Sequence, residues 1–598
     1  MDYKEYEAML KKQYLDELAS IPCEYTDAQV ISEEVMVPMS DGAGMKTYIY
    51  RPDTPQPVPT LFQRGCYTNH MPMIKIYAPE LAKRGFGCVF QFCRGTGGSE
   101  GEWEPNVHER PDGIDSIQWL NDQPWVESIG FYGASYLALT GWAMIDVVPE
   151  KVKAMYLSVY GTNRHVSAYK DGLFRQDILT AWAMGNAGVP ITADYMDSCR
   201  HLPHVQVDED VWGVKLPWYK ELVTHTDFSD PYWQEGFWSV LRSNPSKVKI
   251  PIVIEEGWYD HHLGSALSGY NDMTDAGREN CLLRIGPWDH GKQCPIHAHE
   301  CNDVRSYQIL PIYQWFDTIL RKHEKPESGV SLYVVGQDRW LEQPQWPQEI
   351  SNMQYYFDMA RRTLNPGASA DASATALTDA PADVSATAPT DAPADASITA
   401  PANAPYTDGT VGKVSFVYDP KNPVPSYGAE SCFSTRSATG SLKQPEPGYR
   451  DDVISFVSEP MAENVMLLGK INADIYVSSD AEDTAFSIKI MEVLENGEAY
   501  NIRSGITTLA YRNHSDQRQT YTPGEIVKIN IDTWDIAWEM KKGSCIRVDI
   551  SSSDFPQYSA HTNYPGVWAL QDKCKAARQT LYSGAGYSSV LNLPVYEK

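Results

Sequence analysis

The sequence predicts an α/β domain that contains an inserted helical segment and is followed by an all-β domain. In the first part of the chain, short apolar runs alternate with amphipathic segments, which is typical of a mostly parallel sheet covered by helices on both faces. A stretch rich in Trp, Tyr and Met interrupts this alternation over residues 163–246. From about residue 326 the pattern changes to strands separated by turn residues, with few helical periods.

The strands of the α/β domain are expected where buried apolar runs end in a turn or loop. These runs lie at 60–65, 88–93, 128–133, 154–161, 250–257 and 281–286. Amphipathic segments at 73–85 and 113–123 are expected to form helices between them. The α/β domain therefore has two parts, residues 1–162 and 247–325.

Residues 163–246, which separate these two parts, are expected to form a helical cap. Helix-like sequence such as FRQDILTAWAMGNAG lies within them. In an α/β enzyme, an insertion between two strands lies over the carboxyl ends of the sheet, where ligands bind. The insertion is therefore expected to cover a pocket.

Residues 326–598 are expected to form an all-β sandwich or jelly roll. The expected strands include 330–336, 411–419, 470–479, 485–493, 525–532 and 544–553. An Ala-, Thr-, Pro- and Asp-rich insertion at 367–408 contains an internal repeat at 373–405. Because this composition cannot bury a core and its prolines oppose a helix, we predict a disordered insertion between two strands.

Charge and composition argue against several classes of function. The chain has 78 acidic and 50 basic residues, a net charge of −28, and no long Lys/Arg run, so binding to nucleic acid or to an anionic membrane is not expected. The N-terminus lacks the apolar core of a signal peptide and no run of about 20 apolar residues follows, which favours a cytoplasmic protein. Eleven scattered cysteines favour reduced thiols over a disulfide framework.

The segment GFYGASYLALTGW (130–142) places Ser135 between a strand-like run and a helix-like run. A serine nucleophile needs a strained strand-to-helix turn, and small neighbouring residues permit that turn. Gly133 lies two residues before Ser135, but Leu137 replaces the glycine that usually lies two residues after it. Taken alone, the segment also fits a serine in an ordinary tight bend.

Two later segments supply partners for Ser135. In an α/β hydrolase, the acid and then the histidine follow the serine, each in a loop after a strand. Asp260 ends the strand-like run IPIVIEEGWYD, and His290 follows the run CLLRIGPWD. His261 and His262 adjoin Asp260 too closely to donate a hydrogen bond to it and also reach Ser135, and Asp289 is expected to be a turn residue.

A second cluster, CPIHAHEC, contains Cys294, His297, His299 and Cys301. These are ligand types that zinc prefers, but their spacing matches no common zinc motif and so short a loop opposes tetrahedral geometry. We expect an ordinary loop here and no metal. The glycine-rich RGTGGSEG lacks the GK[ST] of a phosphate-binding loop and is expected to be a structural turn.

Four stretches resemble the CocE/NonD-type hydrolases: QFCRGTGGSEGEW, WVESIGFYGASYL, IPIVIEEGWYD and RIGPWDHG. This family includes bacterial cocaine esterase, α-amino-acid ester hydrolases, glutaryl-cephalosporin acylases and, more distantly, X-Pro dipeptidyl-peptidases. VYDPKNPVPSYG, DVISFVSEP and VDISSSDFPQY resemble its jelly-roll domain. The resemblance implies an α/β-hydrolase domain with a helical cap, followed by a jelly roll.

The resemblance also implies roles for individual residues. Ser135 is the nucleophile, His290 is the general base and then the general acid, and Asp260 orients His290. The oxyanion hole consists of the Tyr67 hydroxyl and the backbone N–H of Tyr136. His262, Tyr169 and Trp182 are the expected substrate-binding residues.

Two departures from the family pattern bear on this prediction. The usual QDxRG reads QFCRG here, so the aspartate is replaced by Phe92. Amino-acid ester hydrolases follow the catalytic acid with carboxylates that bind the substrate ammonium, whereas His261 and His262 follow Asp260 here. Two protonated imidazoles would repel an ammonium, which disfavours amino-ester and dipeptidyl substrates.

The predicted function is hydrolysis of a carboxylic ester through an acyl-enzyme, with a small neutral acyl group or an aromatic ester as substrate. The same residues also fit an amidase or acylase, an acyltransferase or an X-Pro dipeptidyl-peptidase, and these alternatives stay open. A non-catalytic binding protein is a further alternative, although the intact Ser135, Asp260 and His290 argue against it. The partner is a small-molecule ester or amide, no cofactor is required, and a homodimer is possible.

Overall fold

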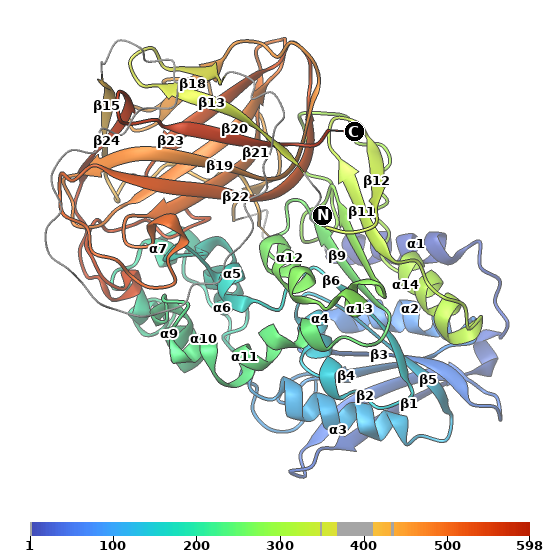
Figure 1. Ribbon diagram of the computed structural model, residues 1–598. Coiled ribbons are helices and arrows are strands. Elements are labelled where there is room, and N and C mark those ends of the chain that lie inside the picture. Colours follow the sequence, from blue (N-terminus) through green and yellow to red (C-terminus); the bar gives the residue numbers. More distant parts are fainter. Residues whose placement is uncertain (1–2, 347–349, 368–410, 432–435, 598) are drawn as a thin grey trace, which may run out of the picture.

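The computed structural model describes residues 3–346, 350–367, 411–431 and 436–597. The predicted order of an α/β domain with a helical insertion and then an all-β domain is confirmed (Figure 1). The predicted disordered insertion at 367–408 lies, after residue 367, outside the described residues. None of the described helices is long and apolar enough to span a membrane, and the cytoplasmic location stays a prediction.

The α/β domain is built on a sheet of ten strands within the described residues. In spatial order they are β1 (Val30–Pro38), β2 (Gly44–Pro52), β4 (Gly87–Phe92), β3 (Val58–Gly65), β5 (Val126–Ala134), β6 (Val152–Ser158), β9 (Ile252–Gly257), β10 (Cys281–Gly286), β11 (Gly329–Val334) and β12 (Arg339–Gln343). Strands β4 through β11 are parallel, whereas β1, β2 and β12 pair antiparallel at the two edges. All six strands predicted for this domain form.

The predicted boundary at 325/326 falls within this sheet. The pattern of the run at 330–336 predicts a strand of the all-β domain, but this run forms β11, which pairs in parallel with β10 from Leu282↔Gly329 to Ile285↔Leu332. A short apolar run fits either kind of sheet, and its partner is decided by non-local pairing. The sheet therefore ends with β12 and not before β11.

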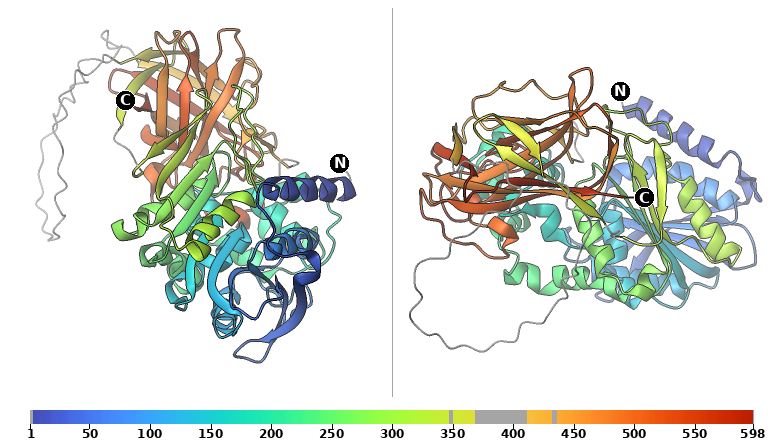
Figure 2. Two further views of the ribbon diagram at one scale, coloured as in Figure 1. Left: turned by 90° about the vertical axis from the view of Figure 1, so that its right-hand side faces the viewer. Right: turned by 45° about the horizontal axis from the view of Figure 1, so that its top comes forward.

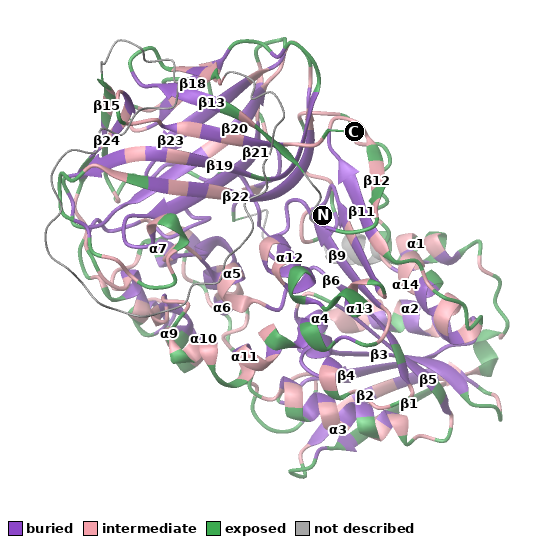
Figure 3. Ribbon diagram, viewed as in Figure 1, coloured by how far each residue is buried: buried purple, intermediate pink, exposed green. Residues whose placement is uncertain are grey.

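Helices cover both faces of the sheet, so its central strands are buried throughout (Figure 3). Their bounds are α1 (Tyr3–Leu18), α2 (Met71–Lys83), α3 (Glu109–Asn121), α4 (Tyr136–Trp142), α12 (Leu263–Asp272), α13 (Asp275–Arg278) and α14 (Leu310–Phe316). Successive residues of β3 point to opposite faces. Leu61 belongs to the hydrophobic cluster that contains side chains of α2 and α14, and Phe62 belongs to the cluster that contains side chains of α3 and α4.

The helical insertion joins β6 to β9, as predicted. It consists of α5 (Arg164–Ala168), the hairpin β7 (Tyr169–Lys170) and β8 (Leu173–Phe174), α6 (Gln176–Gly185), α7 (Tyr195–Arg200), α8 (Val207–Asp210), α9 (Pro217–Thr224), α10 (Pro231–Gln234) and α11 (Gly236–Ser243). It lies against both domains, and its Phe174 ring stacks on Trp568 of the all-β domain (Figures 1 and 2). The cap is therefore held from two sides.

The all-β domain contains an eleven-stranded sheet within the described residues. Its strands are β13 (Ser351–Asp358), β14 (Thr363–Pro366), β15 (Val411–Tyr418), β18 (Ile454–Ser458), β19 (Val465–Ser479), β20 (Ala485–Val493), β21 (Ala499–Thr508), β22 (Val527–Met540), β23 (Cys545–Ser551), β24 (Ala577–Gly584) and β25 (Val590–Val595), and β16 (Tyr427–Ala429) pairs separately with β17 (Ala438–Thr439). The more specific assignment to a jelly roll stays a prediction.

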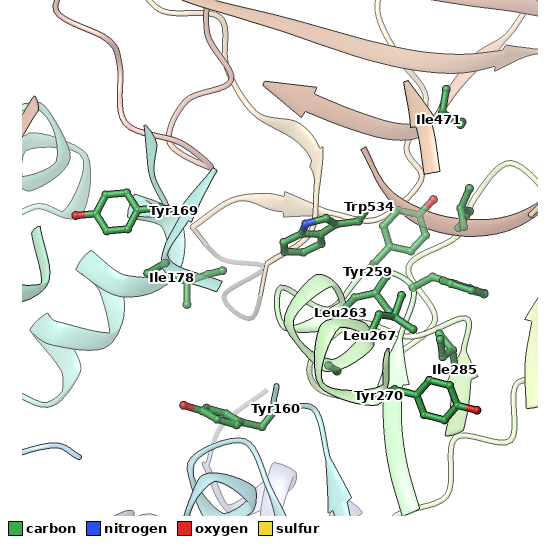
Figure 4. Packing of buried hydrophobic residues seen from close by; sticks show 14 of the residues in the cluster. Tyr160, Tyr169, Ile178, Tyr259, Leu263, Leu267, Tyr270, Ile285, Ile471 and Trp534 are labelled. Atoms are coloured by element: carbon green, nitrogen blue, oxygen red, sulfur yellow. The ribbon is translucent and has the colours of Figure 1, made fainter. Parts of the chain in front are cut away.

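The two domains share one continuous hydrophobic core. Figure 4 shows Trp534 of β22 beside Leu263 of α12, with Tyr259 close to both. A Cβ atom at Gly264 would lie 2.6 Å from the Trp534 ring, so the absence of a side chain there allows α12 to approach β22. This packing supports the loop between β9 and α12, which carries Asp260.

Candidate active site

Ser135 lies in the sharp turn between β5 and α4. Its backbone has φ 57° and ψ −128°, a strained conformation for a residue with a side chain. A Cβ at Gly133 would lie 2.5 Å from the Leu137 carbonyl, so this turn requires glycine there. Leu137 fills the space beside Gly65 at the end of β3, where a Cβ would approach it to 2.8 Å. The turn thus accommodates leucine in place of the usual second glycine.

The structure brings together the three side chains predicted to form the catalytic triad. His290 Nε2 lies 3.0 Å from Ser135 Oγ, and His290 Nδ1 lies 2.7 Å from Asp260 Oδ2. The second oxygen of Asp260 accepts the backbone N–H of His262 at 2.6 Å. All three residues follow the carboxyl ends of parallel strands, β5, β9 and β10, which meet at one edge of the sheet.

The surroundings of His290 favour its charged form. Burial by itself would lower the pKa of His290, but the charge of Asp260, the hydrogen bond to it and the charge of Asp289 outweigh this and raise the pKa. Asp289 makes no triad contact. Its Oδ1 accepts the backbone N–H groups of Gly291 and Gln293, each at 2.9 Å, so it is a turn residue as predicted.

This raised pKa predicts the pH profile. A protonated imidazole cannot accept the Ser135 proton, so kcat/KM falls as the pH is lowered through the pKa of His290. We expect the midpoint of this acid limb to lie above the ordinary histidine value of 6.5, measured with an uncharged ester. A midpoint well below 6.5 would show that Asp260 does not stabilise the imidazolium.

Two adjacent glutamates on β9 have opposite electrostatic environments. Burial and the nearby charge of Asp260 raise the pKa of Glu256 well above its usual value, which favours the neutral form of this carboxyl. Glu255 is equally buried, but Lys292 and Arg284, helped by the Tyr156 hydroxyl at 2.7 Å, lower its pKa. Neither glutamate could be selected from the sequence, because EE inside an apolar run does not reveal which carboxylate finds a partner.

These environments predict opposite effects of two matched substitutions at pH 8. Glu255→Gln leaves Lys292 buried without its counter-ion and should lower the free energy of unfolding by about 3–5 kcal/mol. Burial favours the protonated form of Glu256, whereas the unfolded chain loses this proton at pH 8, so Glu256→Gln should leave the stability unchanged or higher. Urea unfolding measures both, and a large loss in Glu256→Gln would mean that this carboxyl is ionised and paired.

The two predicted oxyanion-hole residues line the same cavity as Ser135. Tyr67 follows β3, and its hydroxyl oxygen accepts the indole N–H of Trp182 at 3.0 Å. Tyr136 is the first residue of α4, a position whose backbone N–H has no acceptor within the helix. The Tyr136 ring stacks on Trp182 and its hydroxyl donates to the buried Glu109. Aromatic packing therefore holds both expected donors in place.

Replacing Tyr67 by phenylalanine tests its expected role. If the hydroxyl donates to the tetrahedral oxyanion, Tyr67→Phe should lower kcat by about 10²–10³-fold with a much smaller effect on KM. Phenylalanine keeps the ring contact with Tyr136, so the packing is preserved. Steady-state kinetics on p-nitrophenyl esters measure the effect. An unchanged kcat would show that the Tyr67 hydroxyl does not belong to the oxyanion hole.

A cavity of about 650 Å³ opens beside Ser135 and His290. Of the expected substrate-binding residues, Trp182 and His262 line it. Tyr169 is not among the described residues that line the cavity, so its prediction as a substrate-binding residue is wrong. Its hydroxyl donates to the Leu222 carbonyl of α9 at 2.8 Å and its ring packs against Trp233 of α10, inside the cap.

The expectation that His261 and His262 repel a substrate ammonium is wrong. Burial lowers the pKa of both His261 and His262 well below the usual value, so both rings are neutral. His262 Nδ1 and the Ser167 hydroxyl form a 2.9 Å hydrogen bond, and the His262 ring packs on Tyr160. These imidazoles therefore do not repel an ammonium by charge.

The Cys/His loop does not bring its four candidate zinc ligands together. His299 Nε2 bonds to Glu492 of β20 at 2.7 Å, whereas the Cys294 and Cys301 thiols contact each other. Among the described residues, one group of three side chains places its potential metal-ligand atoms within 4.8 Å of one another. These residues are Asp260, His261 and His290. The loop instead contacts the all-β domain, through His299 and Glu492 and through the pairing of Ile296 with Ser441.

Comparison with known proteins agrees with this architecture. A model of the X-Pro dipeptidyl-peptidase S15 family matches residues 41–292, and a model of the C-terminal non-catalytic domain of X-Pro dipeptidyl-peptidases matches residues 322–592. The chain is 26% identical to the cocaine esterase of Rhodococcus sp. (strain MB1 Bresler) over 95% of this chain and 99% of that enzyme. The chain belongs to the CocE/NonD-type serine hydrolase family.

Solved structures show how widely this fold is shared. An α-amino-acid ester hydrolase superposes with a TM-score of 0.77 at 20% identity, covering 96% of this CocE/NonD-type hydrolase and 98% of its own chain. An aminopeptidase from a marine sediment Thaumarchaeota archaeon gives 0.77 at 18% identity, covering 97% and 99%. A CocE/NonD family hydrolase from Staphylococcus aureus gives 0.62 at 16% identity, covering 95% and 94%.

Proposed function

We propose that this CocE/NonD-type hydrolase cleaves carboxylic esters through a covalent acyl-enzyme. The carrying observation is the hydrogen-bonded series Ser135–His290–Asp260 at the edge of a cavity. The aromatic side chains that line the cavity, with Trp182 and Tyr160 among them, suit a small neutral acyl group or an aromatic ester.

The geometry supports the following sequence of steps. Ser135 Oγ attacks the ester carbonyl while its proton passes to His290 Nε2, and Asp260 stabilises the imidazolium that forms. The negative charge on the carbonyl oxygen is stabilised by the Tyr67 hydroxyl and the Tyr136 N–H. The C–O bond to the alcohol breaks as His290 protonates the leaving oxygen. Water, deprotonated by His290, then attacks the acyl-enzyme and releases the acid.

Amidase, acylase, acyltransferase and X-Pro dipeptidyl-peptidase activities use the same acyl-enzyme. The S15 family match keeps the peptidase alternative open. Within the described lining of the cavity, no Asp or Glu is available to bind a substrate ammonium. This absence favours an ester without a free amino group over a peptide N-terminus.

The experiment is a burst measurement with labelling. With p-nitrophenyl acetate and butyrate, we expect a burst of nitrophenol equal to the enzyme concentration, and a fluorophosphonate probe should modify the peptide that contains Ser135. Added amines separate hydrolysis from acyl transfer, because a transferase yields amide in place of acid. Absence of both the nitrophenol burst and the labelling of Ser135 would support the alternative hypothesis that the chain is a non-catalytic binding protein.

A further inference from the structure

Arg164 borders the cavity that contains Ser135. It is the first residue of α5, where the chain enters the cap, and it is half-buried. A second cavity of about 550 Å³ shares Asn106, Arg164 and Trp182 with the first. Arg164 therefore lies where the two cavities adjoin.

Among the described residues that line the Ser135 cavity, Arg164 is the only Lys, Arg, Asp or Glu. The histidines outside the triad do not add charge: burial lowers the pKa of His70 to about 4, and those of His261 and His262 well below the usual value. A permanent positive charge thus faces an otherwise nearly neutral cavity, in a chain whose net charge is −28.

No carboxylate of the described chain pairs with Arg164, and no described group accepts a hydrogen bond from it. Buried arginines elsewhere do have partners: Arg94 pairs with Asp112 at 2.7 Å, and Arg503 pairs with Glu430 at 3.2 Å. Partial burial of an unpaired charge is unfavourable, and a counter-ion supplied by a ligand removes this cost. A guanidinium fits a carboxylate through two parallel hydrogen bonds.

The Tyr160 hydroxyl is a second unpartnered polar group in the wall of the same cavity. This hydroxyl is buried and has no hydrogen-bond partner within the described chain. In Figure 4 the Tyr160 hydroxyl points to the left, and Ile178 of the cap lies on that side. Ile178 also lines the cavity. Burial raises the pKa of Tyr160 to about 12, so the phenol keeps its proton and can donate it, and Arg164 lines the same cavity.

We infer that Arg164 and Tyr160 form a subsite for a carboxylate on the substrate, which is an ester that carries a carboxylate remote from the scissile bond. This inference rests on the proposed function and specifies its substrate class. The ester group reaches Ser135 while the carboxylate lies at the junction of the two cavities. Glu104, Glu221 and Glu235 line only the second cavity, so an anion would not move further into it.

Two pairs of substrates test this subsite. Mono-4-nitrophenyl adipate and its methyl ester place the carboxylate, or its neutral replacement, on the acyl side. 4-Acetoxybenzoate and methyl 4-acetoxybenzoate place it on the alcohol side. We expect the wild type to prefer the carboxylate member of at least one pair by 10-fold or more in kcat/KM. The preferred pair shows which half carries the anion, and a preference for the adipate would replace the small neutral acyl group proposed above.

The variants connect this preference to the residues. Arg164→Gln should lower the carboxylate-to-methyl-ester ratio of kcat/KM by about 10–100-fold. Arg164→Lys should retain part of the ratio, and Tyr160→Phe should lower it less. Arg200, an exposed cap arginine that packs over Phe555, provides the control, because Arg200→Gln should leave the ratio unchanged.

The outcomes separate the subsite from the proposed function. Ser135-dependent hydrolysis with no preference for the carboxylate substrates, or a preference that survives Arg164→Gln, would overturn the subsite and leave the esterase intact. The wild-type preference is measured without any variant, so a folding defect in Arg164→Gln does not remove the test. Absence of burst, labelling and hydrolysis with every ester would overturn both.

Discussion

Replacing Ser135 with alanine is expected to lower kcat for p-nitrophenyl butyrate by about 10⁶-fold. Ser135 Oγ is the atom placed to attack, 3.0 Å from the base His290, and alanine leaves no nucleophile there. Fluorophosphonate labelling and the nitrophenol burst should disappear together with turnover. The residual rate should be that of an enzyme that binds the ester and stabilises the oxyanion without forming an acyl-enzyme.

The control for this variant is a serine that lies far from the cavity. Ser415 is exposed on β15 and bonds to Thr580 at 2.8 Å, so Ser415→Ala should keep wild-type turnover and labelling. Unfolding curves of Ser135→Ala and the wild type should coincide within about 1 kcal/mol, because the substitution removes one hydroxyl. Equal turnover by Ser135→Ala and the wild type would mean that the nucleophile lies elsewhere.

Replacing Asp260 with asparagine is expected to lower kcat by about 10⁴-fold. Asp260 Oδ2 accepts the His290 Nδ1 hydrogen, which leaves Nε2 free to accept the Ser135 proton. An amide that donates to Nδ1 stabilises the other tautomer, and it supplies no charge to stabilise the imidazolium. Because the charge of Asp260 raises the pKa of His290, the acid limb of the pH profile should also move to lower pH.

Asp289 provides a matched control for this prediction. It adjoins His290 in sequence, but its Oδ1 accepts only backbone N–H groups of its own turn. Asparagine can keep that acceptor, so Asp289→Asn should retain kcat within about 5-fold. A loss in Asp289→Asn equal to that in Asp260→Asn would indicate that the loop, and not the tautomer of His290, limits the rate.

Much of the α/β domain could be predicted because its signals are local. Each central strand is an apolar run that ends in a turn, and burial on both faces makes such runs nearly continuous. Ser135, Asp260 and His290 could be selected because their order along the chain and their positions after strands are characteristic of this type of site. The local patterns did not reveal that β11 pairs with β10, since that partner lies more than 40 residues away.

The predictions for the site that are wrong also depend on contacts between segments far apart in the sequence. Tyr169 was expected in the pocket, yet the side of the cap that an aromatic ring faces depends on packing against α9 and α10. The histidines after Asp260 were treated as potential cations, but burial keeps them neutral. Arg164 and Glu256 carry no sequence signal, because the presence or absence of a partner becomes visible only in three dimensions.

The amino-acid sequence by itself determined the order of the domains, the family and the residues of the expected triad. These follow from hydrophobic periodicity and from short motifs, which are encoded by residues close together in the chain. Only the tertiary structure decided where the α/β sheet ends, which cap side chains face Ser135, and that a single unpaired guanidinium borders the cavity. Burial and charge pairing depend on segments far apart in sequence, so they arise only when the chain has folded.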